Sequence, residues 1–227
     1  MTSATRIIAI SRATADDLIS VYPEHSNKIH VVHHRADHLG HSPAERVETR
    51  PQTGGLLYVG TRYKYKNFDN VLRAMTAHEW PRDVKLNVVG PVATSTELHR
   101  ISELGLQGRV VMRGRLTEQE LRKAYRDSTA FIFPSLCEGF GFPILEAQLL
   151  NTAVVCSDIP VFREVGGKDT TLLFDPSDPH SIANAVARVQ NETVRRELVA
   201  RGRINASQYT WDRCAAERYA VFQQAMQ

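Results

Sequence analysis

Short apolar, β-branched runs alternate along the chain with longer stretches whose apolar residues recur at helical spacing. The predicted strands are residues 56–60, 84–90, 110–112, 130–134, 153–156 and 171–174. The predicted helices are residues 68–78, 95–104, 118–126, 143–150, 181–190 and 194–209. Alternation of strand and helix in this way predicts an α/β fold, with a parallel sheet that has helices on both faces.

Start signals support several of these helices. Thr117 is followed three residues later by Glu120, as in a capping box, and Asp178 stands directly before Pro179. Asn67 precedes the helix 68–78 and is predicted to cap it. These signals predict where three of the helices begin.

The first part of the chain follows a different pattern. Residues 6–10 and 29–33 are predicted strands, with a helix between them that Ser11 caps. The polar stretch that follows holds two prolines and a Gly-Gly pair, which is typical of a linker. The expected division is 1–35, a remnant of another domain; 36–55, a linker; 56–210, one complete domain; and 211–227, a final helix after a break.

The composition is that of an ordinary globular protein. Hydrophobic residues make up 42% and charged residues 23% of the 227 residues, a length that suits one α/β domain with a sizeable core. The formal net charge of +3 is too small to indicate nucleic-acid binding but suits a small ligand that carries phosphate. Because no apolar run could cross a bilayer and residues 1–6 lack a signal-peptide pattern, we expect a cytoplasmic protein.

Cysteine and histidine residues raise two further questions. The three cysteines are Cys137, Cys156 and Cys214. They are far apart and fit neither a disulfide framework nor a zinc site, so reduced thiols are expected, with Cys137 as a catalytic nucleophile left as an alternative. Four histidines of the linker region are His33, His34, His38 and His41. Their spacing matches no metal-ligand template, and a solvated loop explains them.

The segment 133–146 has the most informative pattern. It follows a predicted buried strand and leads into a helix whose first residue is expected to be Pro143. The turn Gly139–Gly141 should therefore lie at a helix N-terminus and at the carboxyl end of a parallel strand. Unsatisfied amides and the helix dipole favour an anion there, and the glycines let the backbone approach it closely. We expect this anion to be a phosphate.

Two carboxylates flank the turn. Glu138 precedes it, and Glu146 follows about one turn into the helix. Because a carboxylate is a poor ligand for phosphate, both should bind hydroxyls, which suggests a sugar on one side and a ribose on the other. The alternative is structural: Glu146 compensates the helix dipole, and Glu138 is an exposed loop residue.

A basic cluster follows the strand 56–60. After Gly60 come Arg62, Lys64 and Lys66. Gly60 permits a tight exit from the strand, and the cations can neutralise a diphosphate whose charge grows as it leaves. The alternative is a solvated basic loop.

These motifs resemble glycosyltransferase family 4, a family of retaining enzymes with the two-lobed GT-B fold. Glu138 and Glu146, with seven residues between them, match its E-x7-E signature, and residues 58–68 resemble its donor loop. The family arginine directly follows the glycine, whereas here Thr61 stands between Gly60 and Arg62. The resemblance runs from residue 6 to the end. It implies the Rossmann-like C-terminal lobe of a GT-B fold, with most of the N-terminal acceptor lobe absent.

The resemblance also implies roles for the site residues. Glu138 would contact the transferred sugar, Glu146 the ribose hydroxyls, and Lys66 the diphosphate, while the base would lie against residues 113–116. The implied catalytic residues are Glu138, Lys66 and Arg62. The implied donor-binding residues are Gly60, Thr61, Arg62, Lys66, Arg113, Gly114, Leu116, Ser135, Glu138, Gly139, Phe140, Gly141, Phe142 and Glu146.

The implied activity is retaining transfer of a hexose from a nucleoside-diphosphate sugar to a glycan or lipid-linked acceptor, without a metal or other cofactor. Residues 65–68 resemble those of bacterial mannosyl- and glucosyltransferases of surface-polysaccharide assembly, so GDP-mannose is the first choice of donor and a UDP-sugar the second. The missing lobe, or a partner chain, would hold the acceptor and provide any peripheral contact with the inner face of the membrane. The final helix would cross to that lobe, which would leave its apolar face partly uncovered.

The sequence leaves three alternative functions to consider. As a binding module, the domain would hold a nucleotide sugar without turning it over, because it could not position an acceptor. A sugar-nucleotide epimerase or a phosphorylase shares the fold. A dehydrogenase would need a Gly-x-Gly-x-x-Gly turn after the first strand of the sheet, which the residues after Gly60 do not supply.

Overall fold

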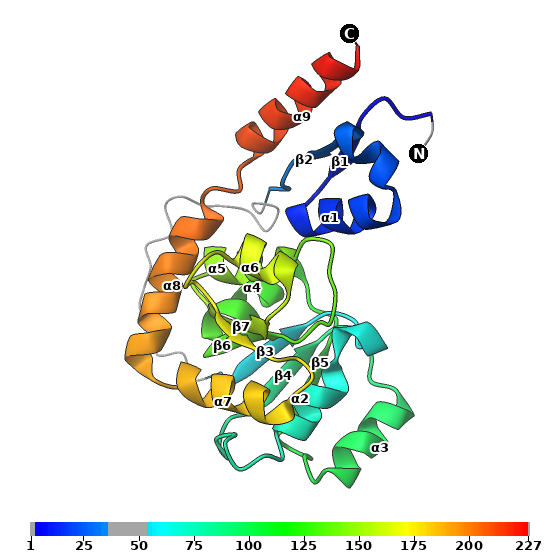
Figure 1. The fold of residues 1–227 in the computed structure, drawn as a ribbon. Coiled ribbons are helices and arrows are strands. Elements are labelled where there is room, and N and C mark those ends of the chain that lie inside the picture. Colours follow the sequence, from blue (N-terminus) through cyan, green and yellow to red (C-terminus); the bar gives the residue numbers. More distant parts are fainter. Residues whose placement is uncertain (1–2, 36–53, 227) are drawn as a thin grey trace.

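A computed structural model describes residues 3–35 and 54–226 of the chain (Figure 1). The predicted linker 36–55, with His38 and His41, lies almost entirely outside the described residues. Within them, one six-stranded parallel sheet forms the main body, and a separate two-stranded parallel sheet lies at one end.

The main sheet is doubly wound. Its strands are β3 (Leu56–Val59), β4 (Leu86–Val89), β5 (Val110–Gly114), β6 (Ala130–Phe133), β7 (Ala153–Ser157) and β8 (Leu172–Phe174). They lie in the order β5-β4-β3-β6-β7-β8, with every neighbouring pair parallel. The chain thus builds outward from β3 to one edge, returns to β6 beside β3, and builds to the other edge. Ligands of open α/β sheets bind at such a reversal, outside the carboxyl ends of the strands.

Helices connect these strands. They are α2 (Phe68–Ala74), α3 (Ser95–Glu103), α4 (Glu118–Asp127), α5 (Phe142–Leu149), α6 (Pro160–Gly166), α7 (Pro179–Val189) and α8 (Glu192–Ala206). A short 3-10 helix, η3 (Lys64–Lys66), precedes α2. The sequence pattern did not predict α6. Its seven residues include buried Val161, Phe162, Val165 and Gly166, so it shows too little polar surface for a helical period to appear.

Two apolar clusters cover the two faces of the main sheet. Leu56 and Tyr58 of β3 pack in one cluster with residues of α2, α3 and α7. Leu57 packs in the other with residues of α4, α5 and α6. Successive side chains of a strand point to opposite faces, so the central strands β3, β6 and β7 are buried on both sides, whereas the edge strands β5 and β8 are partly exposed. The predicted parallel sheet with helices on both faces is confirmed.

Three of the four predicted caps form. The side chains of Ser11, Thr117 and Asp178 accept hydrogen bonds from amides in the first turns of their helices. Asn67 is the N-cap residue of α2, as predicted, but it has a left-handed backbone conformation with φ of 57° and its side chain makes no capping hydrogen bond. Its side chain instead donates to the carbonyl of Pro176 at 2.7 Å, so it joins the start of α2 to the segment before α7.

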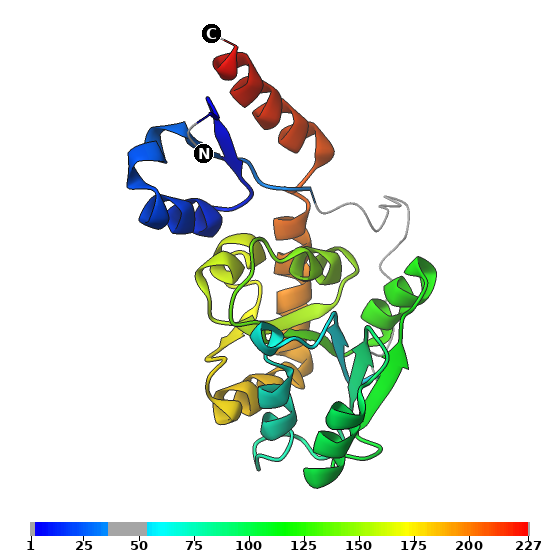
Figure 2. The ribbon, with the colours of Figure 1, turned by 90° about the vertical axis from the view of Figure 1, so that its right-hand side faces the viewer.

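The N-terminal segment and the last helix lie together at one end of the molecule (Figures 1 and 2). The segment contains β1 (Ile7–Ala9), α1 (Arg12–Val21), the 3-10 helix η1 (Pro23–Lys28) and β2 (Ile29–Val31). Helix α9 (Trp211–Ala225) forms a small apolar cluster with this segment through Cys214 and Val221. Other apolar side chains of α9 are exposed, among them Tyr219 and Phe222, so part of its apolar surface is uncovered. Among the described helices, none is both long enough and apolar enough to span a bilayer.

Candidate functional site

Two loops meet where the carboxyl ends of β3 and β6 lie side by side. The β3 loop comprises residues 60–66, and the β6 loop comprises residues 134–141. The amide of Leu136 donates to the carbonyl of Tyr65 at 2.8 Å, which ties the loops together through their backbones. Both loops therefore stand at the switch point of the sheet, the position expected for a ligand.

Lys66 and Glu138 join the same two loops through their side chains. Lys66 Nζ donates to Glu138 Oε1 at 2.5 Å, and Ser135 Oγ donates to the same oxygen at 2.7 Å. Lys66 Nζ also lies 5.2 Å from the ring centre of Phe133. Both ionised side chains are only 16% exposed. Glu138 is thus a half-buried carboxylate that is paired through Oε1, and not an exposed loop residue.

The turn between Glu138 and Glu146 leads directly into the N-terminus of α5. Gly141 is the N-cap of α5, with φ of 102°, and a Cβ there would lie 3.2 Å from the ring of Phe162. Glycine is therefore required both for the conformation and for the close approach. Helix α5 begins at Phe142, so Pro143 is its second residue, one position later than predicted.

Glu146 lies on the other flank of this turn. It is the fifth residue of α5 and is buried, and its Oε2 accepts a hydrogen bond from Tyr125 Oη at 2.9 Å. Tyr125 is fully buried, and this burial, together with the Glu146 carboxylate, raises the pKa of its hydroxyl well above 10. Because the helix dipole acts mainly within the first turn, compensating it does not explain a carboxylate at this position.

Arg62 is engaged away from the turn. Its Nε and Nη2 donate to Glu97 at 2.6 and 3.1 Å, and Nη2 also donates to the carbonyl of Pro91 at 2.9 Å. The side chain is only 4% exposed, and its buried Nη1 has no hydrogen-bond partner among the described residues. Two of its three guanidinium nitrogens are thus bound to Glu97 and Pro91, and its predicted contact with a diphosphate stays a prediction.

Gly60, Thr61 and Gly114 lie at this same edge of the sheet. The amide of Gly60 donates to Val89, and that of Gly90 donates to Gly114, both at 2.9 Å, which extends the strand ladders by one step. The carbonyl of Thr61 accepts a hydrogen bond from buried Tyr58 at 2.7 Å. The Arg113 guanidinium is directed away from this edge, because it donates at 2.9 and 3.0 Å to Asn87 Oδ1, and the Asn87 amide in turn donates to the carbonyl of Gly54, before β3. Leu116 is half-buried against the second core cluster.

The N-terminal segment contacts the turn directly, which the sequence patterns did not predict. The hydroxyls of Ser11 and Thr14 lie 2.8 and 3.0 Å from the carbonyl oxygen of Gly139, and each can donate to it. Ser11 is fully buried at this contact. The first turn of α1 therefore packs on the β6 loop and helps to fix the backbone of Gly139.

Glu164 of α6 makes a second connection to the same segment. Its carboxylate accepts hydrogen bonds from the amides of Arg12 and Ala13 at 2.6 and 3.1 Å, and lies 2.6 Å from His33 Nε2. His33 and His34 also pack against the ring of Phe140, with centroids 6.2 and 5.8 Å apart. The interpretation of these two histidines as part of a solvated loop was wrong, because both are half-buried and have specific partners.

Glu164 should make the stability of the protein depend on pH. Burial alone would raise its pKa, but the Arg12 amide, His33 and the Ala13 amide outweigh it and lower the pKa below 4.5. A lowered folded-state pKa stabilises the protein above the unfolded-state value, and this contribution is lost as the pH falls. The difference in free energy of unfolding between wild type and Glu164→Gln should therefore be largest near neutral pH and shrink between about pH 5 and pH 3. Urea unfolding across this range measures it. Glu118→Gln, at an exposed position of α4, is the control and should show no such convergence.

The cysteines are all free thiols. Cys137 is exposed, whereas Cys156 and Cys214 are buried. Burial raises the pKa of Cys156 to about 12, so this thiol stays protonated. The expectation of reduced thiols agrees with this arrangement.

A hollow of about 180 Å³ lies near Cys214, at the junction of α8 and α9 and not between the two loops.

Residues 53–192, more than half of the chain, match the family model described as Glycosyl transferases group 1. O-antigen chain mannosyltransferase B of Escherichia coli is 28% identical over 227 residues, which cover 95% of this chain and 59% of that protein. The chain therefore spans little more than half the length of this relative.

Solved structures share the fold. A glycosyltransferase from Rickettsia africae superposes with a TM-score of 0.81 at 17% identity, over 98% of this chain and 64% of that one. HepE of Anabaena, in complex with UDP and glucose, superposes with a TM-score of 0.77 at 19% identity, over 97% and 63%. The predicted Rossmann-like lobe of a GT-B fold is confirmed. The family match confirms the resemblance read from the motifs: the chain belongs to the glycosyl transferases group 1 family.

Proposed function

We propose that this chain supplies the donor-binding lobe of a retaining glycosyltransferase. The whole enzyme would move a hexosyl group, with mannosyl first, from a nucleoside-diphosphate sugar to a glycan or lipid-linked acceptor. The observation that supports this most directly is the Lys66–Glu138 pair, held between two loops beside the N-terminus of α5. It puts a cation, a carboxylate and helix amides within one small region at the switch point.

The proposed mechanism separates two charges. The diphosphate would take Lys66 as its counter-ion and accept hydrogen bonds from the amides at the start of α5. Glu138, released from Lys66, would then bind a hydroxyl of the sugar, and Glu146 would bind the ribose on the opposite flank. As the sugar–phosphate bond breaks, Lys66 and the amides stabilise the growing negative charge, and the departing phosphate takes the proton of the attacking acceptor. This proposal gives the protein's own groups, rather than a metal, the task of holding the diphosphate.

The proposed donor is GDP-mannose, with a UDP-sugar as the second choice. The mannosyltransferase relative supports GDP-mannose, and the UDP complex of HepE supports a UDP-sugar as the second choice. The part of the relatives' length that this chain does not span, which would form the acceptor lobe, or a partner chain, would supply the acceptor and any membrane contact. A cytoplasmic reaction belongs to the same proposal. Until that lobe is present, the chain should bind donor without transferring sugar, because no acceptor is held beside it.

Isothermal titration of GDP, UDP and ADP in EDTA tests the proposal. We expect one of the three nucleotides to bind clearly more tightly than the other two, and we expect it to be GDP. Lys66→Met keeps the aliphatic stem but removes the charge, and should weaken binding by about 10- to 100-fold, since a hydrogen bond to a charged group contributes about 1.5–3 kcal/mol. Glu138→Gln should leave binding of the bare diphosphate unchanged or make it tighter, because Lys66 would lose its competing partner.

Lys123→Met is the matched control. Lys123 is also paired with a carboxylate, Asp127, but it lies on the exposed face of α4. Its replacement should leave nucleotide affinity unchanged. The proposal fails if none of the three nucleotides binds, or if Lys66→Met binds as tightly as Lys123→Met. Sugar transfer by this chain alone would contradict the part of the proposal that requires the missing lobe.

A further inference from the structure

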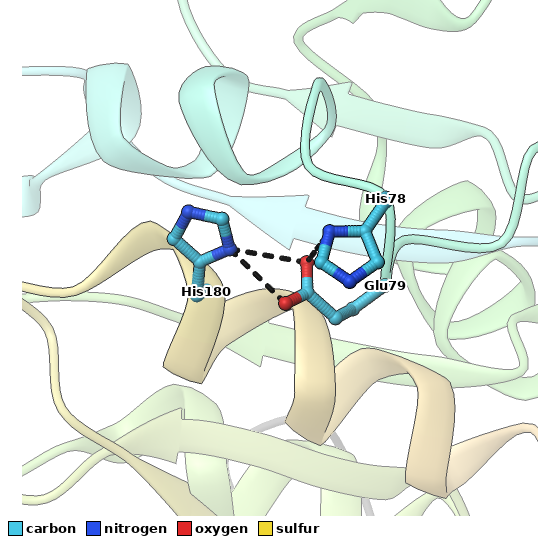
Figure 3. Close-up of side chains that lie close together, drawn as sticks. All are labelled: His78, Glu79 and His180. Carbon is cyan, nitrogen blue, oxygen red and sulfur yellow. Dashed lines mark hydrogen bonds and ion pairs between the residues drawn. The ribbon is translucent and has the colours of Figure 1, made fainter.

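His78, Glu79 and His180 form a compact cluster away from the two loops of the candidate site (Figure 3). His78 and Glu79 lie in the connection between α2 and β4, and His180 is the second residue of α7. These elements contain none of the predicted donor-binding residues. The cluster therefore has no role in the function proposed above.

Both imidazole rings point toward one carboxylate, as Figure 3 shows. His180 Nδ1 lies 3.1 Å from each oxygen of Glu79, and His78 Nδ1 lies 3.3 Å from Glu79 Oε2. One nitrogen from each ring and one carboxylate oxygen all lie within 4.8 Å of one another. Two imidazoles and a carboxylate make a ligand set that zinc and neighbouring transition ions bind.

The spacing of these atoms suits a metal ion. Ligand atoms around a tetrahedral zinc, with bonds of about 2.0–2.1 Å, lie about 3.3 Å from one another. Both histidine–glutamate separations are already close to this value. Approach of the two ring nitrogens, which lie within 4.8 Å of each other, to about 3.3 Å would complete three corners of a tetrahedron.

The surroundings hold the Glu79 side chain and the backbone of His180, while both imidazole rings are exposed, His180 at 61%, and can adjust to an ion. Glu79 is only 18% exposed at its side chain, and it precedes Trp80, which is buried and donates to the carbonyl of Val84 at 3.2 Å. The amide of His180 donates to Asp178 Oδ1 at 2.9 Å, which fixes the first turn of α7. His78 is 86% exposed, so its ring can turn toward an ion without disturbing packed neighbours. Helices α2 and α7 pack in the same apolar core, and this packing keeps His180 close to His78 and Glu79.

We propose that His78, Glu79 and His180 bind a divalent transition ion, preferably zinc, with water in the fourth position. The ion would link the α2–β4 connection to the first turn of α7 and stabilise the folded chain. Magnesium should bind poorly, because it prefers oxygen ligands in octahedral geometry. This site would be structural and separate from the diphosphate.

Isothermal titration calorimetry of zinc chloride with the tag-free chain tests this proposal. We expect one zinc ion per chain and no comparable binding of magnesium chloride. Zinc should also raise the Tm, because an ion that binds only the folded state stabilises it. His180→Ala and Glu79→Gln should each weaken zinc binding at least tenfold and remove the rise in Tm.

His99→Ala is the control for binding to surface histidines in general. His99 is exposed and pairs with Glu103 at 3.2 Å, but this pair belongs to α3 and not to the three-residue cluster. Its replacement should change neither the affinity nor the rise in Tm. Equal zinc affinity in wild type and His180→Ala would overturn the proposal, as would an equal loss in His99→Ala. Circular dichroism of each variant without zinc shows whether it is folded, and Glu79→Gln preserves the shape of the side chain should His180→Ala prove unstable.

Discussion

Replacement of Gly90 by alanine should lower the free energy of unfolding by about 3 kcal/mol. Gly90 directly follows β4, and a Cβ there would lie 2.2 Å from the carbonyl oxygen of Gly60. This oxygen belongs to the backbone and cannot rotate away as a side chain could. The ends of β3 and β4 would have to separate, and the hydrogen bond from the Gly90 amide to Gly114 would be strained. Urea unfolding followed by circular dichroism measures the loss.

Gly108→Ala is the matched control for this variant. Gly108 also has positive φ, at 75°, but a Cβ there would have no atom within 4 Å. Only the backbone strain remains, and it should cost about 1 kcal/mol. Because Gly60 begins the β3 loop, Gly90→Ala should also weaken binding of the nucleoside diphosphate, whereas Gly108→Ala should not. Equal stability of the two variants would show that the close approach of β3 and β4 is wrong.

The centre of the main sheet could be predicted because strands β3, β6 and β7 are buried on both faces. Such strands appear as short continuous apolar runs, and residues 130–134 are an example. Helix ends were less predictable. The pattern extended the second helix to residue 78, but α2 ends at Ala74, because the chain turns there to bring Trp80 into the core. A local pattern records which residues are apolar but not where the chain must turn to bury them.

The candidate site was predictable where its signal is local. The spacing of Glu138 and Glu146 around a glycine turn lies within nine consecutive residues, and the structure puts that turn at a helix N-terminus. The partners of these acids are distant in sequence. Lys66 lies 72 residues from Glu138, and Tyr125 lies 21 residues from Glu146. The opposite charges of Lys66 and Glu138 were consistent with their pairing. No sequence pattern distinguishes Tyr125 from other core tyrosines as the partner of Glu146.

Two other contacts were missed for different physical reasons. Glu97 completes a capping box with Thr94 at the start of α3. The same carboxylate also binds Arg62, which lies 35 residues away, too far along the chain for a local pattern to indicate the pair. Ser11 likewise caps α1 and contacts Gly139, which lies 128 residues away. Hydroxyl groups are too common along the chain for such a contact to be predicted without the fold.

Glu146→Gln should weaken binding of the preferred nucleoside diphosphate about tenfold, because a neutral acceptor replaces a charged one at the ribose and this difference amounts to about 1.4 kcal/mol. The proposed partners are the ribose hydroxyls, so a 2′,3′-dideoxy nucleoside diphosphate provides the sharpest probe. Wild type should bind the dideoxy compound more weakly than the ribonucleotide, and Glu146→Gln should bind the two almost equally. Isothermal titration of both compounds against both proteins measures this coupling.

Tyr125→Phe separates this role from a structural one. Glu146 accepts a hydrogen bond from the Tyr125 hydroxyl inside the core, and Tyr125→Phe removes that donor while keeping the ring. If Glu146 serves only to pair with Tyr125, both variants should lose stability, and neither should change the ratio of ribonucleotide to dideoxy affinity. If Glu146 binds ribose, only Glu146→Gln should abolish the preference for the ribonucleotide. An unchanged preference in a folded Glu146→Gln variant would exclude the ribose contact, and the carboxylate would then belong to the core alone.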